Sequence, residues 1–230
     1  MKSAVLLTAG ACAFLPMTTG AGEVNLYGLP GASSGSYTVR VTSLKEAKFL
    51  RTIKQQYDFS CGSAALATLL AYHYGDPVTE AAIFQYMYER GNQAKIQREG
   101  FSLLDIKNYL ESHGYTADGF ETSLDKLAEV GVPAIVLISD NGYHHFVVVK
   151  GVQAGKVLVG DPSMGSRIIS RPEFEKLWSN GIVFVITSKR DLATFNASVE
   201  WGTGMAPLGT AISRNALSST LIFMRTRSDF

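Results

Sequence analysis

The chain has 230 residues, of which 46% are hydrophobic and 18% charged, and its formal net charge is +1. This length and composition predict one globular domain with a full core and some appendages, and they exclude a largely disordered chain. The charges are balanced and form no basic stripe, which argues against nucleic acid or an anionic membrane surface as a partner.

The first 22 residues have the pattern of a secretory signal peptide. Lys2 is their single charge, residues 4–15 form an apolar run, and Pro16 with small residues follows. The run is too short for a transmembrane helix, so we expect cleavage between Thr18 and Gly22, a periplasmic protein and no stable membrane insertion. Cys12 lacks the larger aliphatic residue that usually stands three positions before a lipidated cysteine, so lipoprotein anchoring is not expected.

Residues 23–50 are interpreted as an N-terminal extension. Their first part, 23–36, is rich in glycine and serine and is predicted to be mobile. Alternation of apolar and polar residues over 37–42 predicts a strand, for which the sequence shows no evident partner.

Helices are predicted in the next part of the chain. In the first, residues 60–74, one apolar face is expected to be buried, and Gly75 ends it. The others begin after Thr79, after Ser102, where Asp105 completes a capping box, and after Thr122 or Ser123.

The pattern then changes to strands. Apolar runs or alternation predict strands at 133–139, 145–152, 156–161, 166–170 and 182–187, with a short helix from Pro172 before the last. Helices first and antiparallel strands second predict an α+β domain, which we place at residues 51–188. Residues 189–230 are interpreted as a C-terminal extension with one strand-like patch at 221–224.

Cys61 is the candidate nucleophile. Once a signal peptide containing Cys12 is removed, the chain has no second cysteine with which Cys61 could form a disulfide. It stands at the start of a predicted helix, where the helix dipole stabilises a thiolate. A small buried apolar residue is the alternative interpretation, and position alone does not decide between the two.

Two adjacent histidines are candidates for the base. His73 lies on the apolar face of the first helix, which predicts a core position, and His113 ends a helix, where a cation complements the dipole. His144 and His145 start a strand and therefore point to opposite faces of it. Either could accept the thiol proton, and the pattern of residues does not choose between them.

Asp161 and Gln55 are candidate supporting residues. If residues 152–155 turn a hairpin, residues whose numbers sum to about 307 face each other, which brings Asp161 close enough to orient the imidazole of His145. A strand-ending turn is the alternative for Asp161-Pro162. Gln55, with the backbone N–H of Cys61, could stabilise an oxyanion, and a surface glutamine is the alternative.

Together these motifs resemble the bacteriocin-processing leader peptidases, which are papain-like cysteine peptidase domains that cut after a double glycine. The matching residues are Gln55-x5-Cys61-Gly62-x-Ala64-Ala65-Leu66, then His145-Phe146-Val147-Val148-Val149, then Asp161-Pro162. The resemblance implies that Cys61 is the nucleophile, His145 rather than His144 the base, Asp161 the orienting acid and Gln55 the oxyanion donor. It implies no metal and no other cofactor.

The exported, stand-alone arrangement is similar to peptidases that accompany functional-amyloid (Fap-type) secretion. We therefore expect a polypeptide substrate, such as an exported fibre subunit or a secretion component, to bind in a groove between the helices and the sheet. Two alternatives stay open. One is an inert peptidase-like module that binds an exported chain, and the other is an acyltransferase that uses the same residues.

Overall fold

The computed structural model describes residues 22–26, 37–140 and 142–204. The predicted signal peptide up to residue 21, with Cys12, and the strand-like patch at 221–224 lie outside the described residues. The chain divides into two units, Met1–Ser43 and Leu44–Phe230. Each is described separately below.

In the first unit, a two-stranded antiparallel ladder joins β1 (Gly22–Leu26) to β2 (Tyr37–Val41), with Gly22 opposite Val41. The strand expected at 37–42 is confirmed, and β1 is its partner. Residues 23–26, the start of the segment predicted to be mobile, alternate polar and apolar residues and pair with β2.

The second unit begins with helices: α1 (Leu44–Ala47), α2 (Cys61–His73), α3 (Glu80–Arg90), α4 (Gln93–Glu99), α5 (Leu103–Ser112) and α6 (Leu124–Val130). The predicted caps form. Thr79 accepts the N–H of Ala82, and Ser102 and Asp105 cap α5 reciprocally. Ser123, not Thr122, caps α6. Helices α1 and α4 were not predicted.

The strands of this unit are β3 (Ala117–Glu121), β4 (Ala134–Asp140), β5 (Tyr143–Gln153), β6 (Lys156–Asp161), β7 (Gly165–Ser170) and β8 (Ile182–Ile186). Among the described residues they form one antiparallel sheet in the order β3-β8-β4-β5-β6-β7. Helix α7 (Arg171–Leu177) follows β7, and a short 3-10 turn, η1 (Arg190–Leu192), precedes α8 (Ser198–Gly204). The predicted α+β fold is confirmed; β3 and α8 were not predicted.

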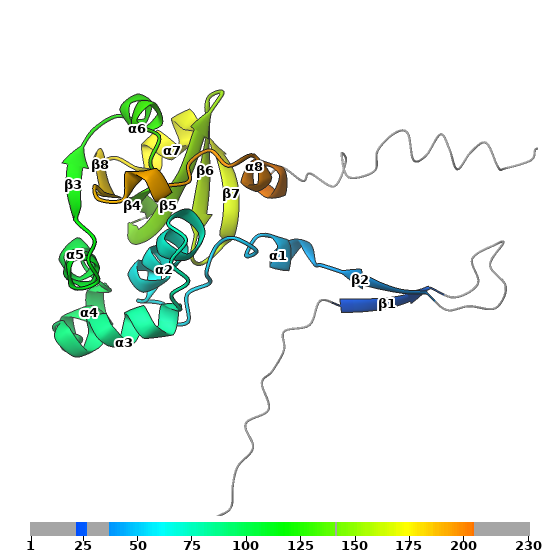
Figure 1. Ribbon diagram of the computed structural model, residues 1–230, viewed down its shortest axis with the longest axis horizontal. Coiled ribbons are helices and arrows are strands. Elements are labelled where there is room, and N and C mark those ends of the chain that lie inside the picture. Colours follow the sequence, from blue (N-terminus) through cyan, green and yellow to red (C-terminus); the bar gives the residue numbers. More distant parts are fainter. Residues whose placement is uncertain (1–21, 27–36, 141, 205–230) are drawn as a thin grey trace, which may run out of the picture. The chain divides into compact units, whose positions relative to one another are not determined.

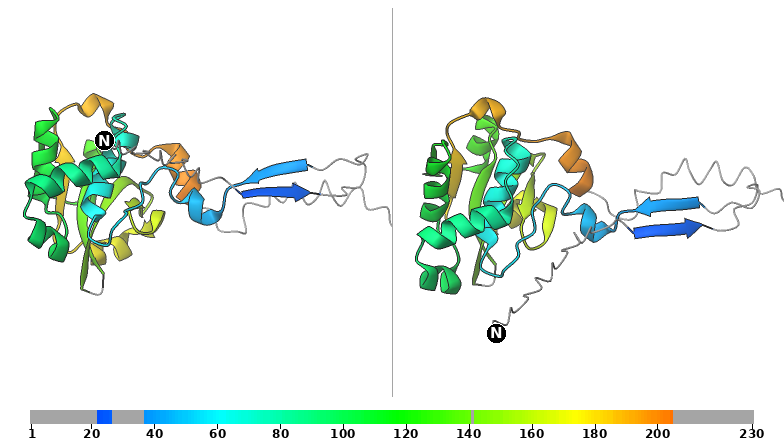
Figure 2. Two further views of the ribbon diagram at one scale, coloured as in Figure 1. Left: turned by 90° about the horizontal axis from the view of Figure 1, so that it is seen from below. Right: turned by 60° about the horizontal axis from the view of Figure 1, so that its bottom comes forward.

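Helices cover both faces of the sheet (Figures 1 and 2). Side chains of α2, α3, α4 and α5 share one apolar core with one face, and side chains of α6 and α7 share a second core with the other. Helix α2 is buried along nearly its whole length rather than on one face as predicted, because the sheet packs on one side of it and α3 and α5 on another. A central helix of this kind holds its first residue rigidly against the sheet.

The hairpin of β5 and β6 differs from the predicted register. Near the turn, opposite residues sum to 309 (Gln153↔Lys156), and beyond a bulge at Lys150 they sum to 308 (Val148↔Gly160). The bulge inserts one residue into β5, which sequence alternation cannot reveal. Continuing this register places Val147 opposite Asp161, so His145 and Asp161 are diagonal neighbours on one face.

Helix α8 is fastened to this unit by a charged cluster, which consists of the buried side chains of His73, Lys150 and Glu200 and the half-buried side chain of Arg51. The ammonium of Lys150 contacts the carboxylate of Glu200 and the backbone carbonyl of Arg51, and both side chains are about 1% exposed. Arg51 Nε lies 3.1 Å from Glu200 Oε1, and His73 Nε2 lies 3.8 Å from it. Part of the predicted C-terminal extension thus completes the interior of the domain.

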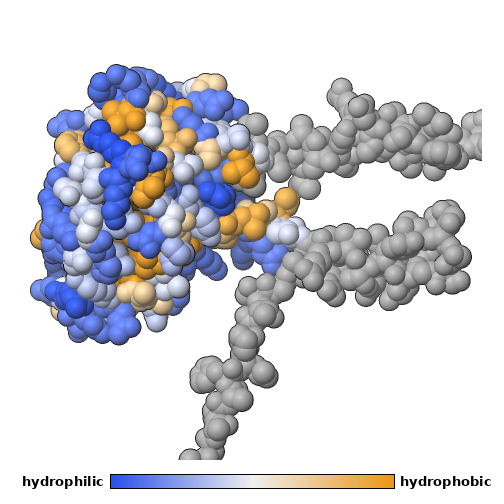
Figure 3. All heavy atoms as spheres, viewed as in Figure 1, coloured by the Kyte–Doolittle hydropathy of each residue, from blue (hydrophilic) through white to orange (hydrophobic). Residues whose placement is uncertain are grey.

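The surface of the second unit is mixed. Figure 3 shows polar and charged side chains over most of the displayed face, with apolar side chains in smaller patches. In the part of the chain that the structure describes, we found no helix with the length and apolarity needed to cross a bilayer.

Candidate active site

Cys61 is the first residue of α2, is 6% exposed and is a free cysteine within the part of the chain that the structure describes. Ser60 precedes it at the capping position, but its hydroxyl turns back to the loop, where it accepts from the N–H and donates to the carbonyl of Tyr57. Ser60 therefore does not cap the helix with its side chain. Among the described residues, the first N–H groups of α2 beside the sulfur have no side-chain acceptor.

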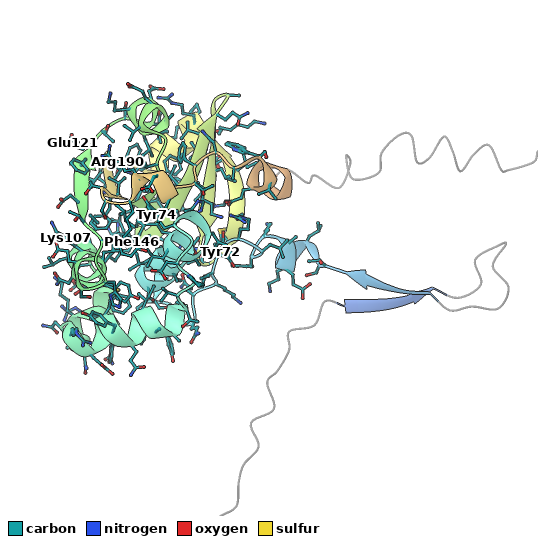
Figure 4. The ribbon with its side chains drawn as sticks, viewed as in Figure 1. Tyr72, Tyr74, Lys107, Glu121, Phe146 and Arg190 are labelled. Carbon is teal, nitrogen blue, oxygen red and sulfur yellow. The ribbon has the colours of Figure 1, made fainter. Side chains whose placement is uncertain are left out.

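Gly62 is required by packing. A Cβ at this position would lie 3.0 Å from Cβ of Phe101 and 3.5 Å from the ring of Phe146. Both rings belong to the core that α2 shares with the sheet, and Phe146 is labelled in Figure 4. The Cys-Gly pair of the motif thus lets the start of α2 approach β5 closely.

The structure brings His145 and Asp161 together. His145 Nε2 lies 2.8 Å from Asp161 Oδ1, and both side chains are buried. The other ring nitrogen, Nδ1, is buried and makes no well-aligned hydrogen bond among the described residues. Cys61 acts on this ring as a second partner. The thiol thus helps to raise the pKa of the imidazole, although the described residues form no hydrogen bond to Nδ1.

The electrostatics of the pair favour an imidazolium beside a carboxylate. Burial alone lowers the pKa of His145, but its interactions with Asp161 and Cys61 outweigh burial and raise the pKa to about 9. Burial alone raises the pKa of Asp161, but His145 and Ser163 lower it to about 2. The carboxylate is therefore ionised at neutral pH and stabilises a positive charge on the ring.

The two adjacent histidines have different surroundings, as strand alternation predicted. His144 lines a groove of about 600 Å³, together with Cys61. The rest of the lining is mainly apolar and comes from the start of α5 and from β4, β5 and β8: Phe101, Leu103, Leu104, Ile135, Leu137, Phe146 and Ile182. The groove lies between helices and sheet beside Cys61, as expected for a substrate cleft, but His144 rather than His145 is among its lining residues.

Gln55 is fixed within the loop that precedes Cys61. Its backbone N–H donates to the carbonyl of Pro162 at 3.0 Å, which anchors it beside the Asp161 turn. Its side-chain Nε2 donates to the carbonyls of Tyr57 (3.0 Å) and Asp58 (3.4 Å). Both amide hydrogens are thus directed at the loop, so Gln55 reaches an oxyanion only after its side chain turns.

Three further residues hold the pair in place and were missed in the sequence. Ser163 donates its N–H (2.9 Å) and its hydroxyl (2.7 Å) to Asp161 Oδ1, and Arg167 lies 3.0 Å from Oδ2. Tyr143 stacks on the ring of His145, and its hydroxyl donates to the carbonyl of Asp58 at 3.1 Å. Ser163 and Tyr143 had usable signals, an Asp-x-Ser turn and a same-face position two residues before His145. Arg167 required the register of β7.

Comparison with known proteins identifies the family. The model of the peptidase C39 family matches residues 50–191, more than half of the chain. The chain belongs to the peptidase C39 family. It is therefore a cysteine peptidase, as the sequence motifs implied.

Two C39 relatives carry the description "probable functional amyloid protease FapD". One, from Pseudomonas aeruginosa, is 41% identical over 74% of this chain and 74% of its own length. The other, from Pseudomonas fluorescens, is 39% identical over 72% of each. The peptidase domain of Streptococcus ComA has the same fold, with a TM-score of 0.51 and 20% identity over 59% of this chain and 96% of that domain.

A metal centre is not evident in the described ranges. No group of three or more His, Cys, Asp or Glu side chains is arranged there to hold an ion.

Proposed function

We propose that this C39 peptidase is exported to the periplasm and cleaves an exported polypeptide through Cys61, His145 and Asp161. The observation that carries the proposal is the position of His145, whose ring is bonded to Asp161 through one nitrogen and influenced by the Cys61 thiol. A thiol, an imidazole and a buried carboxylate in this order are the components of covalent acyl transfer.

The proposed reaction has two halves. The thiol proton of Cys61 moves to His145, and the thiolate adds to the carbonyl carbon of the scissile peptide bond. The imidazolium then protonates the leaving amine as the C–N bond breaks, which leaves a thioester at Cys61. A water molecule, deprotonated by His145, attacks the thioester, and the carboxylate product leaves as the thiol is restored. Asp161 stays ionised and keeps the ring oriented throughout.

The negative oxygen of each tetrahedral intermediate needs donors. The uncapped N-terminus of α2 supplies the backbone N–H of Cys61. Gln55 is the second proposed donor, provided that its amide leaves the carbonyls of Tyr57 and Asp58. The hydroxyl of Tyr143 remains on the Asp58 carbonyl when it does, so this acceptor is not left unsatisfied.

The groove beside Cys61 fits a polypeptide with apolar side chains. Its walls are mostly apolar, and His144, Asn180 and Glu99 supply polar groups. The FapD relatives, described as probable functional amyloid proteases, support a fibre subunit or another secretion component as the substrate. The signal-peptide pattern at the N-terminus supports the periplasm as the place of action.

The decisive experiment compares two cysteine variants. The full chain is co-expressed with candidate exported fibre proteins, and the products are identified by mass spectrometry. Cys61→Ala should abolish the new termini, whereas the matched control Cys12→Ala should leave them unchanged. Normal processing by Cys61→Ala contradicts the proposal. A product joined to an added amine would instead indicate acyl transfer, and failure of iodoacetamide to label Cys61 faster than free cysteine would indicate an inert module.

A further inference from the structure

Arg167 is a charged residue at the site that the proposed mechanism does not yet use. Its Nη2 lies 3.0 Å from Asp161 Oδ2, and the Asp161 side chain is 2% exposed whereas that of Arg167 is 28% exposed. The carboxylate is divided between two sets of partners. Oδ1 interacts with the ring of His145 and accepts hydrogen bonds from Ser163 and from the N–H of Met164 (3.2 Å). Oδ2 forms the ion pair with the guanidinium of Arg167.

Strand register explains why Arg167 reaches the carboxylate. On β7, Arg167 lies opposite Val159, and Asp161 lies opposite Gly165. Val159 and Asp161 are two residues apart on β6, so the side chains of Arg167 and Asp161 share one face of the sheet as diagonal neighbours. His145 approaches the same carboxylate from β5. Asp161 is therefore held between a base on one neighbouring strand and a permanent cation on the other.

The two positive partners differ during the proposed reaction. His145 is a cation only while it carries the second proton, and it becomes neutral when it protonates the leaving amine. A buried carboxylate without a positive partner is costly, and it regains neutrality by taking up a proton. Arginine cannot lose its charge in a protein, so Arg167 compensates Asp161 in the steps when the ring is neutral. Among the ion pairs formed by described residues, Asp161 has these two cationic partners.

We propose that Arg167 is a positioning residue of the peptidase, which keeps the Asp161 carboxylate ionised and oriented while His145 gains and loses its proton. The inference rests on the proposed function, because it assigns Arg167 a role that acts through Asp161. The titratable groups around this carboxylate are His145 and Tyr143 from β5 and Arg167 from β7, with Cys61 of α2 acting on the same ring.

The test measures the rate at which iodoacetamide alkylates Cys61 in the full chain as a function of pH, with peptide mapping to separate Cys61 from Cys12. Removing the cation favours proton uptake by the coupled groups Cys61, His145 and Asp161. In Arg167→Met the acid limb of the rate profile should therefore move to a pH about one unit higher. At a pH below the midpoint, the alkylation rate, expressed relative to the plateau rate, should then be about tenfold lower than in the wild type. Arg167→Lys keeps the charge and should return the midpoint close to that of the wild type.

Two controls separate this role from a structural one. Arg171→Met removes an exposed arginine that binds Asp125 far along the chain, and its profile should match that of the wild type. In an Asp161→Asn background, Arg167→Met should produce no further shift, because the residue acts through the carboxylate. If Arg167→Met does not fold, as judged by circular dichroism, the neutral Arg167→Gln replaces it.

The inference is overturned if the midpoint pH of folded Arg167→Met, or of Arg167→Gln in its place, stays within about 0.3 pH units of the wild-type midpoint, which is much less than the expected shift of about one unit. It is also overturned if Arg167→Lys is shifted as far as Arg167→Met, or if the shift persists without Asp161. A wild-type Cys61 that reacts no faster than free cysteine contradicts the proposed function instead, so the two failures are distinguishable.

Discussion

Two buried histidines in this domain have opposite proton affinities. His145 is 5% exposed, and its pKa is raised to about 9, whereas His73 is 1% exposed, and its pKa is lowered to about 4. Burial lowers the pKa of both rings. His145 has a carboxylate and a thiol as neighbours, but His73 shares its site with Lys150 and Arg51 as well as Glu200. Burial is the largest cause of the lowered pKa of His73, whereas at His145 the interactions with Asp161 and Cys61 outweigh burial and raise the pKa.

The difference also separates two uses of buried charge. The site around His145 opens onto a groove through Cys61 and lies within the region that matches the C39 family. The cluster around Lys150 is closed by Glu200, which lies beyond that region. Gly160 packs there so closely that a Cβ would lie 2.7 Å from Lys150 Cε. Near the start of β5, the carboxylate of Asp161 stabilises a proton on His145. Further along the same strand, the ion pair between Lys150 and Glu200 holds α8 against the domain.

The largest expected effect comes from removing the anion beside His145. Asp161→Asn should lower the cleavage rate by about a hundred- to ten-thousand-fold, because the ring loses the partner that orients it and stabilises its charge. The alkaline limb of the remaining activity should move below pH 9, since the interactions that raise the pKa of His145 are weakened. A pH–rate profile for peptide cleavage measures both. An unchanged alkaline limb would contradict this account.

Removing the anion of the second cluster should affect stability rather than chemistry. Glu200→Gln leaves Lys150 and Arg51 uncompensated and should lower the free energy of unfolding by about 3 kcal/mol, measured by urea denaturation. Alkylation of Cys61 in the folded fraction should be unchanged. The control Glu175→Gln breaks the exposed pair with Arg171 and should cost less than about 1 kcal/mol. Equal losses in the two variants would mean that Glu200 does not compensate buried charge.

A smaller effect is expected from the pH dependence of His73. Because its folded-state pKa lies below the value of 6.5 for a free histidine, the unfolded chain binds the extra proton first. Stability should therefore fall as the pH decreases from 6.5 towards 4, by at most about 3 kcal/mol. Thermal unfolding of the wild type and of His73→Gln checks this: the variant should show a shallower decline. Parallel curves would exclude His73 as the cause.

Much of the fold followed from local pattern. The capping residues Thr79 and Ser102, the long apolar strands and the turns at glycine are short-range features, and the structure has them where the sequence predicted them. The elements that were missed lack such signals. Strand β3 contains Asp118 and Gly119 and exists because it pairs with β8. Helix α8 contains Gly202 and is held by the buried contacts of Glu200.

The candidate site divides in the same way. The sequence by itself determined the candidate residues, because Cys61 at a helix start and the Asp161 turn are readable from neighbouring residues, while the choice of His145 over His144 came from the family resemblance. Tertiary structure alone decided which charges meet. The bulge at Lys150 shifts the register of β5, β7 brings Arg167 to Asp161, and α8 delivers Glu200 to Lys150. These contacts join residues distant in the chain, and their geometry depends on strand register and packing, which no local pattern encodes.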